Sequence, residues 1–461
     1  MPGECSQPLS FWHESLSAAS RVPRAPLSAD DRVDVAIVGA GYSGLWTAYY
    51  LKVLDPGLRV AVVEAEVAGF GASGRNGGWC VGRMAGLDLE AGDDTEREGA
   101  MRLQRACFDS VYEVGRVCEK EGIDADFARG GTIGLAMGSA QAERLKREAE
   151  SFQRLGFGDS DLRWLDAESC RNRVAAEGAE GGLLFEHCAA LHPARLVFGL
   201  AETVERQGTR IYEGSRVVRI EAGELVTDRA RLSAGCVVIA TEGYTARLPG
   251  YARSMIPMHS MMVATEPLSE ETWREIGLKR RETFGDGRRI VIYGQRTADG
   301  RLAFGGRGLY LFGSRVRDRF SPRDPGFVRV ERTLRSLFPV LRDTKITHRW
   351  GGALGIARDW RPRVVLDRGR GIARLGSYAG EGVAASNLAG RTLAEAILER
   401  ASERTDLPLV DDGFPSWEPE PLRWVAVRGL RKIGDRLDRR ELEGRPTPRW
   451  ARWLFDAFVR N

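Results

Sequence analysis

The sequence predicts an α/β fold, of the α+β kind, that ends in a helical C-terminal tail. A short β-branched run at 33–38 passes through a glycine-rich turn into a helix and a second apolar run at 60–63, the order of a βαβ unit. Helix and strand patterns then alternate irregularly, which favours a mixed sheet beside the parallel strands. Apolar positions at helical spacing return near the C-terminus.

The predicted elements beyond the βαβ unit follow from local patterns. Apolar residues at helical spacing predict a helix at 96–120, and His192-Pro193 predicts the start of another, since proline suits a first helical turn. The turn 298–300 predicts a hairpin between the strands on either side of it. The predicted strands are 131–135, 216–220, 236–240, 289–295 and 302–305, and a further helix is predicted at 385–400.

Length and composition indicate an ordinary globular chain. Its 461 residues suggest two or three domains, and 43% apolar with 29% charged residues are typical of such proteins. The net charge of +4 is too small for the basic face that nucleic-acid binding needs, so no such partner is expected. No signal peptide or spanning helix is recognisable. We expect a cytoplasmic protein whose first 29 residues form a polar arm on the surface.

The cysteines and histidines predict neither disulfides nor a metal site. The seven cysteines are odd in number and scattered along the chain. They form no CxxC pair, and the five histidines form no HxH or HExxH pattern. Reduced thiols and no bound metal are therefore expected.

The turn after the first strand has the pattern of a dinucleotide-binding Rossmann unit. Gly39 permits the tight turn, Gly41 lets the backbone approach a pyrophosphate, and Gly44 lets the helix pack closely on the strands. Ser43 stands in the first turn of this helix, whose free N–H groups and dipole suit phosphates. Glu64, at the tip of the second strand, is placed to accept hydrogen bonds from the adenosine ribose.

A second glycine-rich loop, residues 69–78, indicates FAD rather than NAD. An NAD domain has no obvious need for such a loop, whereas the ribityl chain and flavin ring extend past the first turn and need close backbone contact. Polar side chains in the loop can serve the pyrophosphate or the flavin edge. The residues assigned here to the cofactor are Ser73, Arg75, Asn76, Gly77 and Gly78.

These motifs resemble the D-amino-acid oxidase superfamily of FAD-dependent amine and amino-acid oxidoreductases. The similarity spans about residues 10–405 and is greatest to the γ-glutamylputrescine oxidase branch. GASGRNGG and the 377–394 block are its most specific parts. The motifs are VGAGYSGLWTAYYLK (38–52), GASGRNGG (71–78), ATEGY (240–244), MVATEPL (262–268), RLAFGGRG (301–308), RWGGALGIARDWRP (349–362) and SYAGEGVAASNLAGRTLA (377–394).

The resemblance implies a Rossmann-like FAD-binding domain interleaved with a mixed-β-sheet substrate domain. The FAD domain would be discontinuous, with residues 30–84, 190–250 and 350–405. Residues 85–189 and 251–349 would form the substrate domain, and 406–461 a basic helical extension.

The resemblance also implies further contacts with FAD. Backbone groups of Val217 or Val218 would meet the adenine, and Thr241 of the ATEGY motif is assigned to the cofactor. The small residues that lead into the helix predicted at 385–400 would point its start at the flavin pyrimidine edge, where its dipole stabilises the charge of reduced flavin. The small or apolar residues of this start are Gly380, Gly382, Val383 and Ala384.

Glu381 departs from the family, where histidine is frequent at this place. A carboxylate here either repels the reduced flavin or meets the amine of the substrate, and both possibilities stay open.

The implied reaction is FAD-dependent oxidation of a C–N bond in a primary or secondary amine or amino acid. Hydride passes to flavin N5, the resulting imine hydrolyses to a carbonyl product, and oxygen or another acceptor takes the electrons. Aromatic side chains would flank the amine, and an arginine would bind a carboxylate or phosphonate. The candidates are Tyr244, Met261, Arg307, Trp350 and Trp360, each with the alternative of an ordinary core or surface role.

Features of some relatives are missing. No cysteine follows Cys236 to attach the flavin, and no histidine stands between His13 and His187, so FAD is expected to bind noncovalently. Cys80 is the only thiol placed to contact the ring. The lysine that assists oxygen in sarcosine oxidases has no counterpart between residues 279 and 345, so oxidase and dehydrogenase both stay open.

Rival functions also stay open. An NAD(P)H-dependent flavin monooxygenase is one, although no second dinucleotide motif is visible. A non-catalytic or RNA-modifying flavoprotein is another. A third is a membrane-associated dehydrogenase that passes electrons to quinone.

The last of these functions depends on the C-terminal tail. Residues 421–461 carry ten arginines and Lys432 against five acids. Tryptophans recur on two helical faces, around Trp424 and around Trp450 and Trp453, and a basic helix of this kind can lie in a membrane interface. Because dispersed acids make a poor anchor, we favour packing of both faces on the protein itself or across a homodimer.

Overall fold

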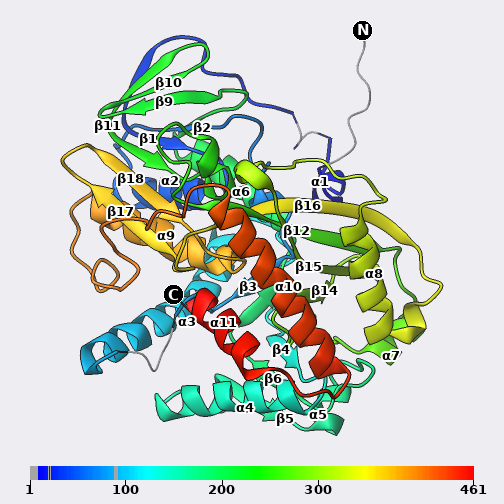
Figure 1. Cartoon of the computed structure of the whole chain (residues 1–461). Helices are drawn as coiled ribbons and strands as arrows, with labels where there is room; N and C mark the ends of the chain where they lie inside the picture. Colours follow the sequence, from blue (N-terminus) through cyan, green and yellow to red (C-terminus); the bar gives the residue numbers. More distant parts are fainter. Residues whose placement is uncertain (1–8, 19, 21, 88–91, 461) are drawn as a thin grey trace.

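Two β-sheets organise residues 9–18, 20, 22–87 and 92–460, which the computed structural model describes (Figure 1). One sheet is largely parallel, the other is largely antiparallel, and helices from distant parts of the sequence pack on both. The predicted α/β fold with mixed sheets and a helical tail is confirmed.

The first sheet contains the predicted βαβ unit. Its strands β1, β2, β8, β11 and β18 pair in parallel, and β17 closes one edge in the antiparallel sense. Buried valines and isoleucines fill β1 and β2 on both faces, as parallel strands require. Within the described residues, the order is β17 (Arg363–Asp367), β18 (Ile372–Gly376), β11 (Arg231–Ile239), β1 (Asp31–Val38), β2 (Val60–Val63) and β8 (Arg210–Tyr212); β10 (Glu224–Thr227) also pairs with β11, and β9 (Val217–Glu221) pairs with β10.

The second sheet is built around a long strand pair. Strand β12 lies between β15 and β16 and pairs with both in the antiparallel sense. A separate two-stranded ribbon joins β3 (Trp79–Val81) to β7 (Cys188–Ala190). In the described chain, the order is β16 (Ile346–Ile356), β12 (Ile256–Thr265), β15 (Leu302–Tyr310), β14 (Ile292–Arg296), β13 (Thr283–Asp286), β4 (Thr132–Leu135), β6 (Gly182–Phe185) and β5 (Leu162–Leu165).

Helices pack on both sheets. On the first sheet, α2 packs against α6 and α9, and α3 packs against α9. On the second sheet, α8 packs against β12 and β15, and α4 packs against β5 and β6. The described α-helices are α1 (Phe11–Glu14), α2 (Tyr42–Leu54), α3 (Asp94–Glu121), α4 (Ser139–Arg154), α5 (Ala167–Arg171), α6 (Pro193–Arg206), α7 (Glu270–Ile276), α8 (Pro325–Leu337), α9 (Gly382–Ile397), α10 (Leu422–Leu442) and α11 (Arg449–Arg460).

The predicted elements exist, and most deviations lie at their ends. Helix α9 begins at Gly382, three residues before the predicted start, because the small residues after Glu381 already have helical geometry. Strand β14 begins at Ile292 rather than Arg289. The N–H groups of Arg289 and Ile290 donate to the carboxylate of Asp438 instead of to a neighbouring strand. The interleaved domain boundaries remain a proposal; by its pairing, β16 goes with the second sheet.

Only part of the described N-terminal segment is the surface arm that the sequence predicts: most of 22–29 is exposed, but residues 10–13 are not. Phe11, Trp12 and His13 of α1 are buried, so this part of the prediction is wrong. Trp12 Nε1 donates to the Asn76 carbonyl at 2.9 Å, and Ser10 Oγ donates to the Gly74 carbonyl at 2.9 Å. The segment therefore supports the second glycine-rich loop from behind; residues 1–8 lie outside the described part.

The C-terminal tail forms two helices, and α10 crosses the front of the molecule (Figure 1). Val427, Leu430 and Leu437 of α10 are buried, so this face packs on the protein as predicted. Trp450 and Trp453 of α11 are 66% and 71% exposed, so these tryptophans do not pack on their own chain, and packing across a homodimer stays a prediction. Helix α11 instead turns Ala451 and Phe455 inward: Ala451 is buried, and Phe455 lies against Gly434 of α10.

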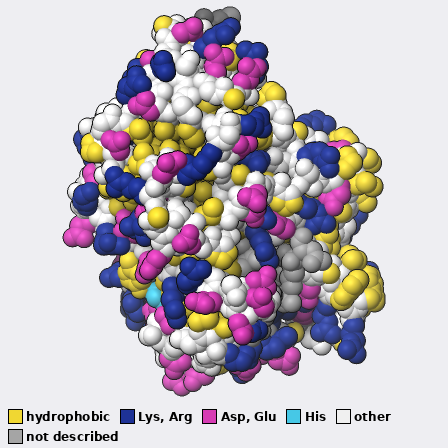
Figure 2. All heavy atoms as spheres, turned by 90° about the vertical axis from the view of Figure 1, so that its left-hand side faces the viewer, with side chains coloured by type: hydrophobic (Ala, Val, Ile, Leu, Met, Phe, Trp, Pro, Cys, Tyr) yellow, Lys and Arg dark blue, Asp and Glu magenta, His cyan; other side chains and the backbone are white. Residues whose placement is uncertain are grey.

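The surface carries both signs of charge. Figure 2 shows basic and acidic side chains intermixed over one face, with hydrophobic side chains gathered in a hollow near its upper centre. No described helix is both long and apolar enough to cross a membrane.

Deleting residues 421–461 should destabilise the protein. Full burial of a leucine or valine contributes on the order of 1.5–3 kcal/mol, and α10 buries three such side chains. We expect a lower thermal midpoint or aggregation of the truncated protein, measured by calorimetry and light scattering. Replacing exposed Trp450 and Trp453 by serine is the control and should leave the midpoint within a few degrees. Salt-sensitive binding of the intact chain to anionic vesicles, lost on truncation, would contradict this packing role.

Candidate functional site

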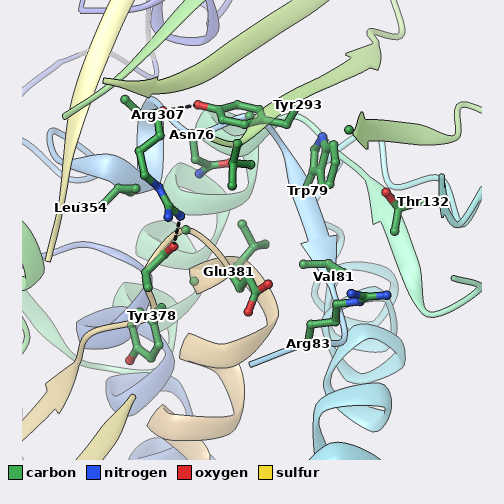
Figure 3. A pocket seen from close by; sticks show the side chains of 18 of the residues that line it. Asn76, Trp79, Val81, Arg83, Thr132, Tyr293, Arg307, Leu354, Tyr378 and Glu381 are labelled. Carbon is green, nitrogen blue, oxygen red and sulfur yellow. Dashed lines mark hydrogen bonds between the residues drawn. The ribbon is translucent and has the colours of Figure 1, made fainter. Parts of the chain in front are cut away.

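A cavity of about 530 Å³ lies where the glycine-rich turn meets the second sheet. The first turns of α2 and α9 reach it from the first sheet, and β14 and β15 reach it from the second. Strand β3, residues of the 72–77 loop, β4, β6, α4 and the loop between β13 and β14 form the rest of its wall. Figure 3 shows Arg307 at the left of this space, reaching toward the segment just before α9 that carries Glu381, with Trp79 and Tyr293 in the upper part of the view.

The glycines of the first turn are required by close contacts. Gly39 has a φ of +107°, and a Cβ there would lie 2.7 Å from the Ala240 carbonyl oxygen. A Cβ on Gly44 would lie 2.0 Å from the Gly39 carbonyl oxygen, so the helix can approach the turn only with glycine. At Gly41 a Cβ would lie 3.0 Å from Ser73 Oγ. The turn therefore has no room for side chains, as a phosphate-binding cradle requires.

Glu64 stabilises this turn from the adjacent strand. Its Oε2 accepts the Ala40 N–H at 2.9 Å, and its Oε1 accepts the Glu66 N–H at 3.0 Å. Burial raises the pKa of the carboxyl group. Ser215 N–H donates to the Glu64 carbonyl at 2.8 Å, which brings the chain that leads to Val217 beside the same turn.

The second glycine-rich loop is fixed by its own side chains and by the second sheet. Asn76 Nδ2 donates to the carbonyls of Ala72 and Ser73, and its Oδ1 accepts the Gly78 N–H. Gln295 of β14 donates to the Gly77 carbonyl at 2.7 Å. Asn76 thus lines the cavity, while its amide group is already used within the loop.

Ser73 and Ser43 connect this loop and α9 to the start of α2. Ser73 Oγ accepts the Tyr42 N–H at 2.9 Å, and Ser43 Oγ lies 3.0 Å from the Tyr378 hydroxyl. Both serines line the cavity. Two helix N-termini, those of α2 and α9, are thereby held at one cavity, which suits a ligand that carries negative charge at two places.

Arg75 is a buried cation beside the cavity, with 2% of the residue exposed. Its Nη1 donates to the carbonyls of Asp318 and Gly351, whereas Nε and Nη2 meet no hydrogen-bond partner within the described residues. Burial lowers its pKa, because the charged form is poorly solvated. A buried guanidinium with unused donors fits an anionic group such as the diphosphate of FAD.

Arg307 and Glu381 place opposite charges on the cavity wall. Arg307 Nη2 donates to the Ala379 carbonyl at 2.6 Å, and burial lowers the pKa of its guanidinium. Glu381 stands at the N-cap position of α9, but its side chain makes no capping hydrogen bond. Its Oε2 atom is buried with no hydrogen-bond partner in the described chain. Burial raises the pKa of Glu381, and the nearby Arg83 and Arg307 oppose that shift.

The cofactor candidates fall into two groups. Those in the cradle but outside the cavity lining are the three glycines at 39, 41 and 44, together with Glu64 and Gly78. Thr241 backs onto Gly39, Val218 is exposed on β9, and Ala384 is buried in α9. The candidates that line the cavity are Ser43, Ser73, Arg75, Asn76, Gly77, Gly380, Gly382 and Val383.

Four of the six predicted substrate residues lie outside the cavity lining. Tyr244 donates to Asp318 at 2.5 Å, and Trp350 donates to the Arg75 carbonyl at 2.9 Å. Met261 is buried in the core of the second sheet, and Trp360 packs 5.5 Å from the Arg307 guanidinium. Glu381 and Arg307 alone among the six line the cavity.

Sequence reasoning missed several lining residues. Glu242, inside the ATEGY motif, accepts the Tyr378 and Gly355 N–H groups, and burial raises its pKa to about 7. Strand β3 presents Trp79, Val81 and then Arg83 to the cavity, every second residue, whereas Cys80 points into the core. The alternation after the second glycine loop was the available signal. No signal in the sequence marks Tyr293 as a lining residue, because its position depends on how β14 pairs with the neighbouring strands.

Comparison with known proteins agrees with this geometry. The profile of a family described as FAD dependent oxidoreductase matches residues 34–396. Gamma-glutamylputrescine oxidoreductase of Escherichia coli is 32% identical over 404 residues, which cover 85% of this chain and 89% of that protein. A probable oxidoreductase named OrdL from Rhizobium meliloti is also 32% identical, over 85% of this chain and 89% of its own.

Solved structures share the fold. Glycine oxidase from Geobacillus kaustophilus superposes with a TM-score of 0.67 at 22% identity, over 80% of this chain and 96% of that one. L-Proline dehydrogenase from P. horikoshii gives 0.65 at 18% identity, over 84% and 96%. The resemblance inferred from the motifs is confirmed: this chain is an enzyme that belongs to the family of FAD-dependent oxidoreductases.

Proposed function

We propose that this enzyme uses noncovalently bound FAD to oxidise a C–N bond in an amine or amino acid that carries a carboxylate. One observation carries the proposal: Arg307 and Glu381 line the same cavity, beside the nucleotide cradle (Figure 3). A cation and an anion so placed suit a substrate with a carboxylate and an ammonium group. Relatives named for γ-glutamylputrescine and glycine, which carry both groups, support this class.

The cradle residues would hold FAD. The turn at 39–44 and Arg75 would bind the diphosphate, Glu64 the adenosine ribose, and the start of α9 the pyrimidine end of the flavin. When bound, FAD supplies the two-electron acceptor. Cys80 lies on the core side of β3 and burial raises its pKa far above the usual range, which supports noncovalent binding.

Glu381 would accept a proton from the substrate. An ammonium group has no lone pair, so the amine must lose a proton before its C–H bond can give up hydride. Burial raises the pKa of Glu381, which brings the carboxylate closer in basicity to an amine than an exposed glutamate is. Of the two roles left open for Glu381, we choose contact with the amine, because Arg307 and Arg83 compensate its charge.

Arg307 would hold the carboxylate and orient the carbon. Its bond to the Ala379 carbonyl fixes the guanidinium at the cavity wall and leaves further donors for a ligand. Trp79 and Tyr293 cover the same space, with ring centroids 6.1 Å apart, and would exclude water from the reacting atoms. The imine formed would hydrolyse to a carbonyl product. The electron acceptor and the cytoplasmic location stay predictions.

Anaerobic mixing with amines tests this function directly. Bleaching of the bound flavin is expected with at least one carboxylate-bearing amine or N-methyl amino acid, and not with NADPH. Glu381→Gln should slow the bleaching tenfold or so, about 1.4 kcal/mol of barrier. The wild-type rate should rise with pH as Glu381 loses its proton, above the usual glutamate range because its pKa is raised, and this limb should vanish in the variant.

The control for this test is Glu150→Gln, an exposed position on α4. Its rate and pH profile should match the wild type. Rapid reduction by NADPH with no response to any amine would instead identify a monooxygenase, and no bleaching by either would identify a non-catalytic flavoprotein.

Gly41→Val should yield colourless protein. A Cβ at this position already lies 3.0 Å from Ser73 Oγ, and the added methyl groups would occupy the path of the diphosphate. The measurement is flavin absorbance per mole of purified protein. Gly429→Val is the matched control, because a Cβ there meets nothing within 4 Å. Full retention of yellow FAD in Gly41→Val would overturn the cradle assignment.

Acid precipitation should release the flavin into the supernatant. Noncovalent FAD leaves when the fold is lost, whereas a covalent link keeps the colour in the pellet. The supernatant absorbance at the flavin maximum gives the released fraction. If the pellet stays yellow, Cys80→Ser shows whether that thiol carries the link.

A further inference from the structure

Three arginines line the part of the cavity wall built by α4 and by the loop between β13 and β14. They are Arg144, Arg288 and Arg289, called here the rim arginines. The side chains of Arg144, Arg288 and Arg289 are 33%, 13% and 8% exposed, so Arg144 lies nearest the solvent and the other two lie deeper in the wall.

Glu441, near the end of α10, binds two of the rim arginines. Glu441 Oε2 accepts a hydrogen bond from Arg144 Nη2 at 3.0 Å, and Glu441 Oε1 accepts one from Arg289 Nη1 at 2.7 Å. The Glu441 side chain is 4% exposed, so both bonds are protected from water. Arg144 also donates through Nε and Nη2 to the Gly287 carbonyl, which fixes its position against the loop.

Two aspartates fix the rest of this wall. Asp438 accepts the N–H groups of Arg289 and Ile290 at 2.8 and 2.9 Å, so α10 holds the backbone of the loop as well as its side chains. Asp286 accepts Arg288 Nε at 2.6 Å. The three guanidinium groups are therefore balanced by three carboxylates, which lets them stay assembled before any ligand arrives.

The arrangement is directional. Asp438 and Glu441 do not belong to the cavity lining, whereas Arg144 and Arg289 do. Within the described residues, Arg144 Nη1 and Arg289 Nη2 donate to no protein acceptor. Neither of these two atoms is buried, so both are accessible to water or to a ligand. For Arg144 and Arg289 the cavity thus meets preorganised donors whose carboxylates lie outside the lining, whereas Asp286, the partner of Arg288, lines the cavity beside it.

We infer that the rim arginines form an anion subsite that binds a carboxylate or similar oxyanion at the far end of the substrate. This deepens the proposed function and rests on it: the substrate would carry one oxyanion at Arg307 and a second at the rim. Arginine presents paired donors that match a carboxylate, and fixing it beforehand lowers the entropy lost on binding.

The subsite depends on a part of the chain outside the family match. That match ends at residue 396, and α10 spans Leu422–Leu442. Family members without such a helix would have no carboxylates behind these positions. Selectivity for an acidic far end is therefore a property that α10 gives to this chain.

Binding of dicarboxylates to the FAD-loaded enzyme tests the subsite without any turnover. Glutarate, adipate, pimelate and suberate are each compared by calorimetry with the monocarboxylate of the same chain length. At one length the dicarboxylate should bind about tenfold more tightly, the effect expected of one added charge-assisted contact. Arg289→Met and Arg144→Met should each remove most of this gain, and Glu441→Gln should reduce it severalfold.

Matched controls distinguish loss of the rim subsite from a general loss of charge or of structure. Arg439→Met and Glu443→Gln change exposed residues on α10 or just after it, and both should keep the full gain. Thermal midpoint and flavin content are measured for every variant, and two independent rim variants guard against misfolding of one. Equal binding of mono- and dicarboxylates at every length would overturn the subsite, as would a gain that survives in both rim variants.

One further variant distinguishes this inference from the proposed function. Arg307→Met should weaken mono- and dicarboxylates alike. If it changes neither while the rim variants still reduce dicarboxylate binding, the role of Arg307 is wrong and the rim subsite stands.

Discussion

The contact between α2 and the turn after β1 is the constraint on which the site depends. A Cβ on Gly44 would lie 2.0 Å from the Gly39 carbonyl oxygen, so only glycine allows the helix to begin there. The same device recurs between α2 and α9, where a Cβ on Gly390 would lie 2.8 Å from the Thr47 nitrogen. Because both helices pack this closely, their N-termini reach one cavity together and their dipoles act on one ligand.

The second sheet completes the site by pressing against the glycine-rich loop. Gln295 of β14 and Trp350 of β16 donate to the carbonyls of Gly77 and Arg75, so the second sheet holds the loop at two points. This leaves charged groups in places that water barely reaches. The pKa of Arg75 is lowered and that of Glu381 is raised by the same burial, and a bound anion or amine would relieve this cost. Perturbed groups gathered at a cavity are typical of catalytic sites.

The C-terminal helix adds to this common architecture instead of replacing any part of it. Its carboxylates hold arginines of α4 and of the loop before β14, so a late segment of the chain shapes the entrance to a site built mainly by earlier ones. The same contact explains why β14 starts late: the N–H groups of Arg289 and Ile290 are already used by Asp438. The proposed subsite and the course of this loop thus depend on the same helix, through the buried carboxylates of Asp438 and Glu441.

The sequence by itself determined the βαβ unit, the two glycine-rich loops, most element positions and the family, because these depend on spacing between near neighbours along the chain. Turn glycines, helix periodicity and the His192-Pro193 helix start are local signals of this kind. Only the tertiary structure decided that α1 is buried behind the Gly74 loop and that Arg307 and Glu381 line one cavity while Tyr244, Met261, Trp350 and Trp360 pack elsewhere. It also placed Glu441 between Arg144 and Arg289. Each of these depends on which distant segments meet, and a side chain's neighbours across a packed interface leave no periodic trace in the sequence.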